Sequence, residues 1–316
     1  MNLPGRYNLS NLTKAVRDPE LFFVEARRLA LSANAAYSRY QGLKNPCYVV
    51  EEDWDTLVIL DGCRYDLFED INTLDGLLES RTSAGSESWE FLRENFQGRQ
   101  LHDTVYVTAN PHAPKLDDGT FHRTVNLLKT NWDETLKTVT PGVMTDEALA
   151  IHEEYPHKRL IVHYMQPHFP FIGEKGRQIT HTGVNWNVET NGQEDVPHVW
   201  SGLRDRKLNV DENFVYEAYR ENLELTLPYV RNLLDSLDGK SVVTADHGNL
   251  VGDRTGPVPA KGYGHPKGFY VPGLVTVPWL VVESSERRQI ISEPPSKRDE
   301  IDDDVIESRL KHLGYK

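Results

Sequence analysis

Two short apolar runs in this chain are each followed by an aspartate. The first is Thr56–Leu60, followed by Asp61. The second covers residues 241–245 and is followed by Asp246. Continuous apolar runs of this length are typical of strands buried on both faces of a parallel sheet. In open α/β sheets, ligands bind outside the carboxyl ends of the strands. The two carboxylates are therefore predicted to converge at one edge of a sheet.

Other segments predict the rest of that sheet. Further apolar runs cover residues 104–108, 159–164 and 275–282, and a long helical stretch covers 213–237. Strands that alternate with helices indicate an α/β domain with a mostly parallel central sheet. Pro278 lies inside the last run, which favours an edge strand or a bulge there.

The length of 316 residues suits a single large domain, and no repeat or linker divides it. We expect one domain over residues 1–316 with three peripheral parts. Residues 1–45 form an N-terminal helical extension, residues 173–212 a polar insertion or lid, and residues 284–316 a charged tail. The helix in the extension is predicted to pack or dock on the domain, and contact with a membrane surface is the alternative.

Charge and cysteine content narrow the possible functions. The formal net charge is -13, from 35 basic and 48 acidic residues, and no basic face is evident, which argues against a nucleic-acid partner. An acidic chain that handles an anionic ester needs a local positive charge, and a bound metal supplies one. Two cysteines make no disulfide framework, and neither a signal peptide nor a long apolar span is apparent. A cytoplasmic protein is the expectation.

The acidic strand ends have a histidine beside them, since His247 follows Asp246 directly. Asp61, Asp246 and His247 can together hold one divalent ion. Oxygen and nitrogen ligands suit zinc, manganese or magnesium, and the imidazole favours the first two. Taken singly, each aspartate could instead be a turn or capping residue.

Four segments in order resemble motifs of the alkaline phosphatase superfamily, in its sulfatase-like branch. They are Leu60-Asp61-Gly62-Cys63-Arg64, residues 162–170 with His168, Ala245-Asp246-His247-Gly248-Asn249, and Gly262-Tyr263-Gly264-His265. The resemblance spans roughly residues 54–283. It implies an alkaline-phosphatase-like three-layer sandwich and a metal-dependent hydrolase or transferase of phosphate or sulfate esters.

The same resemblance implies a nucleophile beside the metal, in the segment 82–92 that follows the first strands. Ser86 is favoured, because Gly85 permits a tight turn and residues 87–96 can form a helix whose N-terminus attracts an anion. Ser83 and Ser88 are the alternatives, and Ser86 could also be only an N-cap. Cys63 does not match the Cys-X-Pro-X-Arg pattern of sulfatases that use a modified cysteine, so it is expected to be a small buried residue.

Further residues acquire roles by position. The resemblance makes His168 and His265 donors to the ester oxygens or leaving group, whereas Gln166 stands where an acid often appears, which argues against a complete second metal site. Arg64 could clamp a phosphate, or else pair with Asp66, and Lys267 is a further candidate for substrate binding.

These observations predict phosphoryl-type ester transfer through a serine nucleophile and a divalent metal. The expected substrate is a small-molecule, sugar-linked or lipid-linked ester. Two alternatives stay open, a sulfate-ester hydrolase using the same residues and a non-catalytic binding protein that keeps the fold.

Overall fold

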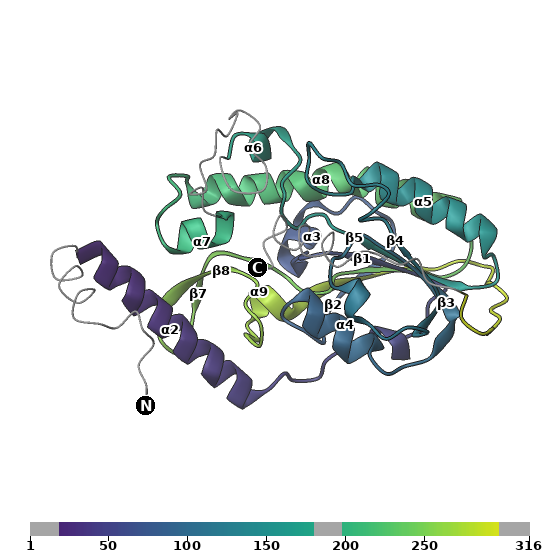
Figure 1. The fold of residues 1–316 in the computed structure, drawn as a ribbon, viewed down its shortest axis with the longest axis horizontal. Helices are drawn as coiled ribbons and strands as arrows, with labels where there is room; N and C mark the ends of the chain where they lie inside the picture. The colour runs from purple at the N-terminus through teal and green to yellow at the C-terminus, as the bar shows by residue number, and fades with distance from the viewer. Residues whose placement is uncertain (1–18, 180–197, 297–316) are drawn as a thin grey trace.

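The computed structural model describes residues 19–179 and 198–296 of the chain. Its centre is a seven-stranded sheet in the order β2-β9-β6-β1-β5-β3-β4 (Figure 1). The strands are β1 (Thr56–Leu60), β2 (Leu77–Thr82), β3 (Leu101–Thr108), β4 (Phe121–Asn126), β5 (Arg159–Tyr164), β6 (Ser241–Thr244) and β9 (Thr276–Val282). Strands β6, β1, β5, β3 and β4 pair in parallel, and β9 is antiparallel to both β6 and β2. The predicted mixed α/β class with a mostly parallel sheet is confirmed.

Side chains that alternate along the central strands divide the apolar core into two layers. Val58 and Leu60 of β1 face one layer, whereas Leu57 and Ile59 face the other. Both faces of such a strand lose contact with water, which is why β1 reads as an uninterrupted apolar run. The sheet therefore lies between two covered faces, as the three-layer prediction required.

Helices cover both faces. Helices α3 (Tyr65–Ile71), α5 (Pro141–Glu154) and α8 (Glu212–Ser236) pack on the first layer, and α4 (Ser88–Phe96) packs on the second (Figure 1). Helix α8 is capped by Asp211, whose side chain accepts hydrogen bonds from the backbone N–H groups of Asn213 and Phe214. Such a cap satisfies donors that the first helical turn leaves unpaired. Short turns η1 (Val49–Glu51) and η2 (Ala113–Lys115) complete this part.

A hairpin of β7 (Leu250–Thr255) and β8 (Ala260–Gly264) stands apart from the sheet, next to helices α7 (Val199–Arg204) and α9 (Pro272–Val275). Helix α2 (Pro19–Gln41) lies along it (Figure 1). Buried Asn34 fixes the contact, because its amide donates to the Thr255 hydroxyl and the Val258 carbonyl and accepts from the Val258 N–H. The expected docking helix is thus seen. Phe22, Leu29 and Tyr40 on it are exposed.

Some expectations differ from the structure. Pro278 does not mark an edge, because β9 pairs on both sides and Thr244 of β6 donates its hydroxyl proton to the Pro278 carbonyl. The predicted lid at 173–212 contains α6 (Glu174–Arg177) and α7, while its residues 180–197 lie outside the described part, as do 1–18 and 297–316 of the two termini. Within the described residues, we find no helix with the length and apolar character needed to span a membrane.

Candidate active site

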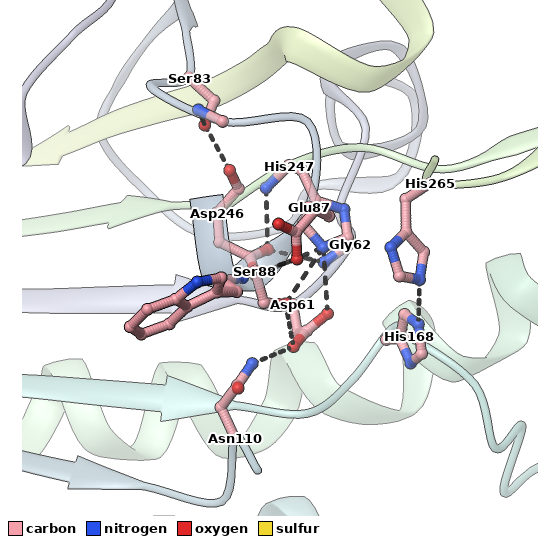
Figure 2. Close-up of polar contacts among 12 residues, drawn as sticks. Asp61, Gly62, Ser83, Glu87, Ser88, Asn110, His168, Asp246, His247 and His265 are labelled. Carbon is pink, nitrogen blue, oxygen red and sulfur yellow. Dashed lines mark hydrogen bonds and ion pairs between the residues drawn. The ribbon is translucent and has the colours of Figure 1, made fainter. Parts of the chain in front are cut away.

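Asp61 and Asp246 lie side by side just beyond the carboxyl ends of the paired strands β1 and β6 (Figure 2). Both side chains are fully buried. Asp246 Oδ1 accepts hydrogen bonds from the backbone N–H groups of Gly62 at 2.9 Å and His247 at 2.8 Å. Burial alone would raise the pKa of Asp246, but the imidazoles of His247 and His163 and the Gly62 N–H outweigh it and lower the pKa. The predicted convergence of the two carboxylates is therefore present, with Asp246 ionised.

His247 presents its Nε2 atom to both carboxylates. The Nε2 atom lies 3.7 Å from Asp61 Oδ1 and 3.5 Å from Asp246 Oδ2. At the other side of the ring, Nδ1 lies 2.7 Å from the Gly248 carbonyl oxygen, so Nδ1 carries the proton and donates it there. In the neutral ring, Nε2 then keeps its lone pair, which suits a metal ligand or a proton acceptor.

Ser88 is the hydroxyl that the structure brings to this group. Its Oγ lies 3.2 Å from His247 Nε2 and 3.3 Å from Asp61 Oδ2 (Figure 2). Ser88 is the first residue of α4, whose N-cap Glu87 accepts from the backbone N–H groups of Trp89 and Glu90. A helix N-terminus favours an anion. One of the three serines named from the sequence thus stands where a nucleophile would be needed.

The hydroxyl favoured from the sequence, that of Ser86, lies elsewhere. Its Oγ donates to Glu90 Oε2 at 3.0 Å and accepts from the backbone N–H groups of Gly268 at 2.8 Å and Phe269 at 3.3 Å. Ser86 therefore ties the start of α4 to the 266–270 segment and does not face the aspartates. The third candidate, Ser83, donates its hydroxyl proton to the Asp246 carbonyl oxygen. Of the three hydroxyls, that of Ser88 is the one that faces the Asp61 and His247 side chains.

His168 and His265 form a pair beside the carboxylates (Figure 2). Their Nε2 atoms are 2.9 Å apart, and His168 Nδ1 lies 2.6 Å from the Phe169 carbonyl oxygen. His168 thus donates through Nδ1, so His265 must donate its Nε2 proton to His168 Nε2. Burial lowers the pKa of His168 to about 4, and burial together with the neighbouring His247 and His168 lowers the pKa of His265. The pair is neutral at neutral pH, and the His265 ring also stacks on His247 at 4.5 Å between centroids.

The predicted substrate-binding cations are placed differently. The guanidinium of Arg64 bonds Asp253 and Asp66, with N···O distances of 2.8 and 2.6 Å, and also the Asn249 carbonyl. This is the ion-paired alternative, extended by Asp253, and it engages the guanidinium fully. Lys267 is exposed on the segment that follows His265. Gln166 is buried and donates to the Val139 carbonyl, so no carboxylate occupies that position. Cys63 is buried in the apolar core, as expected.

Sequence reasoning gave no role to two residues that contact this site. Asn110 follows β3, and its amide donates to Asp61 Oδ2 at 2.8 Å while its Oδ1 accepts from the His112 N–H at 2.9 Å. His163 lies within β5, and its Nε2 is 3.9 Å from Asp61 Oδ2 and 3.7 Å from Asp246 Oδ2. The signal for Asn110 was a polar residue just after an apolar run, the same pattern as Asp61. The signal for His163 was a titratable residue inside such a run.

The donor set fits a divalent metal. Ligand atoms of Asp61, His163 and Asp246 all lie within 4.8 Å of one another, and all three side chains are buried. Asp246 Oδ2 and His163 Nε2 are buried and make no hydrogen bond with the described residues. Buried polar atoms normally have partners, and a shared cation would supply one. Carboxylate oxygens and imidazole nitrogens suit zinc or manganese.

Comparison with known proteins gives structural matches only. Neither a family model nor a curated protein matches the sequence. One solved structure that matches is lipooligosaccharide phosphoethanolamine transferase A from Neisseria meningitidis, an integral membrane protein, at 12% identity and a TM-score of 0.42. The match covers 73% of this chain and 47% of that one. Others are a protein in the alkaline phosphatase superfamily from Vibrio parahaemolyticus (12%, TM-score 0.43, 82% of this chain and 65% of that one) and the lipoteichoic acid synthase LtaP from Listeria monocytogenes (13%, TM-score 0.43, 89% and 78%).

One of these solved structures is described as a protein in the alkaline phosphatase superfamily. Their TM-scores lie below 0.5, so function has to be inferred from the site itself. The chain spans less than half the length of the integral membrane transferase.

Proposed function

We propose that this protein is a metal-dependent transferase or hydrolase of phosphate esters with Ser88 as its nucleophile. One observation carries the proposal: the Ser88 hydroxyl, at the N-terminus of α4, lies within 3.3 Å of both His247 Nε2 and Asp61 Oδ2. A serine alone is a weak nucleophile and needs an adjacent base, a lowered pKa or a metal. The Asp61 carboxylate stands against this hydroxyl as a proton acceptor, and a metal held beside it would lower the pKa of the hydroxyl.

The metal would be held by Asp61, Asp246 and His247, as predicted from the sequence. When bound there, a divalent ion would lower the pKa of a hydroxyl close to it and offset negative charge on the ester oxygens. The acidic net charge of the chain makes this local positive charge necessary, because the nearby Arg64 is already paired with two carboxylates.

The protein's own groups have separate tasks in the reaction. Ser88 Oγ gives its proton to Asp61 Oδ2 and forms a bond to phosphorus as the bond from phosphorus to the leaving oxygen breaks, and the leaving oxygen takes up a proton. The α4 N-terminus favours the anionic ester. The His168–His265 pair is neutral, with the His265 Nε2 proton donated to His168, so it borders the site without adding charge. Water or an acceptor alcohol then forms a new bond to phosphorus and releases Ser88.

The substrate is proposed only as a class, a phosphate ester of a small, sugar-linked or lipid-linked alcohol. A cytoplasmic location stays a prediction. Contact of α2 with a membrane surface also stays a prediction, and the exposed Phe22, Leu29 and Tyr40 support it.

The proposal is tested with metal-stripped protein to which zinc, manganese or magnesium is returned. Hydrolysis of an aryl phosphate monoester, an aryl phosphate diester and an aryl sulfate is followed for the wild type, Ser88→Ala, Asp246→Asn and the control Ser236→Ala, whose hydroxyl bonds only within α8. We expect turnover of a phosphate ester that depends on the metal. This turnover should be lost in Ser88→Ala and Asp246→Asn and kept in Ser236→Ala. Faster hydrolysis of the aryl sulfate would indicate a sulfate-ester hydrolase in place of a phosphate-ester enzyme. Metal binding without turnover of any ester would favour a binding protein.

A further inference from the structure

We propose that His163 is a further metal ligand, so that two imidazoles and two carboxylates hold the ion. The inference deepens the proposed function and rests on it for the presence of a metal. The segment 162–170 contains this residue without assigning it a role, whereas β5 places its ring beside both carboxylates.

Strand β5 lies between β1 and β3, with His163 paired in register with Ile59 of β1. Its neighbours Val162 and Tyr164 point into one apolar layer, and Ile161 points into the other. His163 is fully buried among them. An imidazole costs free energy at a position where an aliphatic residue would complete the core, unless its nitrogens are satisfied.

The Nδ1 atom of His163 has a hydrogen-bond partner on the neighbouring strand β3. His163 Nδ1 lies 2.8 Å from the hydroxyl oxygen of Tyr106 on β3. Burial raises the pKa of Tyr106, so its phenol stays neutral, and its oxygen can accept a hydrogen bond from the His163 Nδ1–H. In that tautomer Nε2 keeps its lone pair and faces Asp61 and Asp246. A hydrogen bond from the second nitrogen to fix the ring is the usual arrangement around metal-ligating histidines.

The second nitrogen stands at ligand distance and not at hydrogen-bond distance. His163 Nε2 lies 3.7 Å from Asp246 Oδ2 and 3.9 Å from Asp61 Oδ2, beyond the range of an N–H···O bond. His247 Nε2, the ligand expected from the motif, lies at a similar 3.5 and 3.7 Å from the same two carboxylates. Two ligands of a tetrahedral zinc with bonds of about 2.0–2.1 Å are about 3.4 Å apart. The two imidazoles therefore flank the carboxylates equivalently.

A site with two imidazoles has a consequence for the metal. Imidazole suits zinc, whereas magnesium takes carboxylate, carbonyl and water oxygens. A second imidazole therefore strengthens the preference for zinc or manganese over magnesium. Ser88, the first residue of α4, lies beside Asp61 and His247 of this set.

The first test uses the wild-type chain. X-ray absorption fine structure of the zinc-loaded protein is expected to show two imidazoles for each zinc. A single imidazole would overturn the inference while leaving the proposed function intact, and a wild-type chain that takes up no zinc would remove both. No substitution is involved, so misfolding cannot confuse the result.

The second test measures zinc affinity by titration of three variants, with circular dichroism as the check of folding. His163→Leu is expected to weaken binding by at least about 100-fold, and Tyr106→Phe by about 10- to 100-fold, the effect of losing an outer partner. His152→Gln, on α5 with its Nε2 3.7 Å from Asp238 Oδ1, is the matched control and should bind as the wild type does. Wild-type affinity in a folded His163→Leu would refute the ligand role.

Discussion

The Ser88 hydroxyl lies 3.2 Å from His247 Nε2, whereas the Ser86 hydroxyl, two residues earlier, is bonded to Glu90 and to the backbone of Gly268 and Phe269. Ser88→Ala is therefore expected to lower kcat by roughly 10⁶-fold, the scale seen when a serine nucleophile is removed, with little change in stability.

Ser86→Ala is expected to do the reverse. Loss of the hydroxyl leaves the buried backbone N–H groups of Gly268 and Phe269 without this acceptor, which should lower the free energy of unfolding by about 1–3 kcal/mol while turnover survives. Steady-state kinetics and urea unfolding of both variants check the pair. A dead but stable Ser86→Ala beside an active Ser88→Ala would restore Ser86 as the nucleophile.

Asn110 is expected to set the position of Asp61. Its Oδ1 accepts from the His112 N–H, which fixes the amide so that Nδ2 donates to Asp61 Oδ2. Asn110→Ala frees that carboxylate, and we expect zinc affinity to fall by about 10- to 100-fold. Asn126 offers a matched control, since it accepts from the Leu128 N–H at the end of the neighbouring strand β4. Equal zinc affinity in the two variants, measured by titration, would show that Asn110 only shapes its turn.

The sequence predicted the parts of this site that follow from strand ends. Asp61, Asp246 and His247 each lie at or just beyond the end of an apolar run, and parallel strands bring such ends together. Five of the seven strands were predicted in the same way, from the runs at 56–60, 104–108, 159–164, 241–246 and 275–282.

Sequence reasoning failed where the outcome depends on packing between distant segments. The sequence does not distinguish Ser86 from Ser88 as the serine that faces the aspartates. In the fold, the backbone N–H groups of Gly268 and Phe269 bond the Ser86 hydroxyl and hold it away from them. The contact of His163 with the aspartates was not predicted, because the apolar runs do not reveal the order of the strands, which places β5 beside β1. Pro278 was misread as an edge because a proline does not show how many neighbours its strand has, and β9 pairs with both β6 and β2.

Buried histidines predict how stability depends on pH in the metal-free protein. Burial, with the charge of Lys115, lowers the pKa of His112 to about 3, and burial lowers that of His168 to about 4. Between the ordinary pKa of about 6.5 and these values, the unfolded chain binds protons that the folded chain does not. The free energy of unfolding should therefore fall as the pH is lowered from about 6.5 to about 4, by up to about 1.4 kcal/mol per pH unit for each group.

Urea unfolding across that pH range measures the slope, and His112→Gln should reduce it. His157→Gln serves as the control, because its backbone carbonyl, which bonds the Ile291 N–H, is kept in the variant. A slope that is the same in wild type and His112→Gln would mean that this ring is not held neutral by the fold.

Metal binding should itself stabilise the fold, because Asp61 and Asp246 are completely buried and their charge has to be offset. An ion that binds only the folded state adds about 2.7 kcal/mol at 100 times its Kd. Thermal unfolding with increasing zinc should therefore show a rising Tm for the wild type and for Asp235→Asn, an exposed aspartate on α8. Asp246→Asn should show almost no rise, since it removes a ligand. A Tm that responds to zinc equally in both variants would place the bound ion away from Asp246.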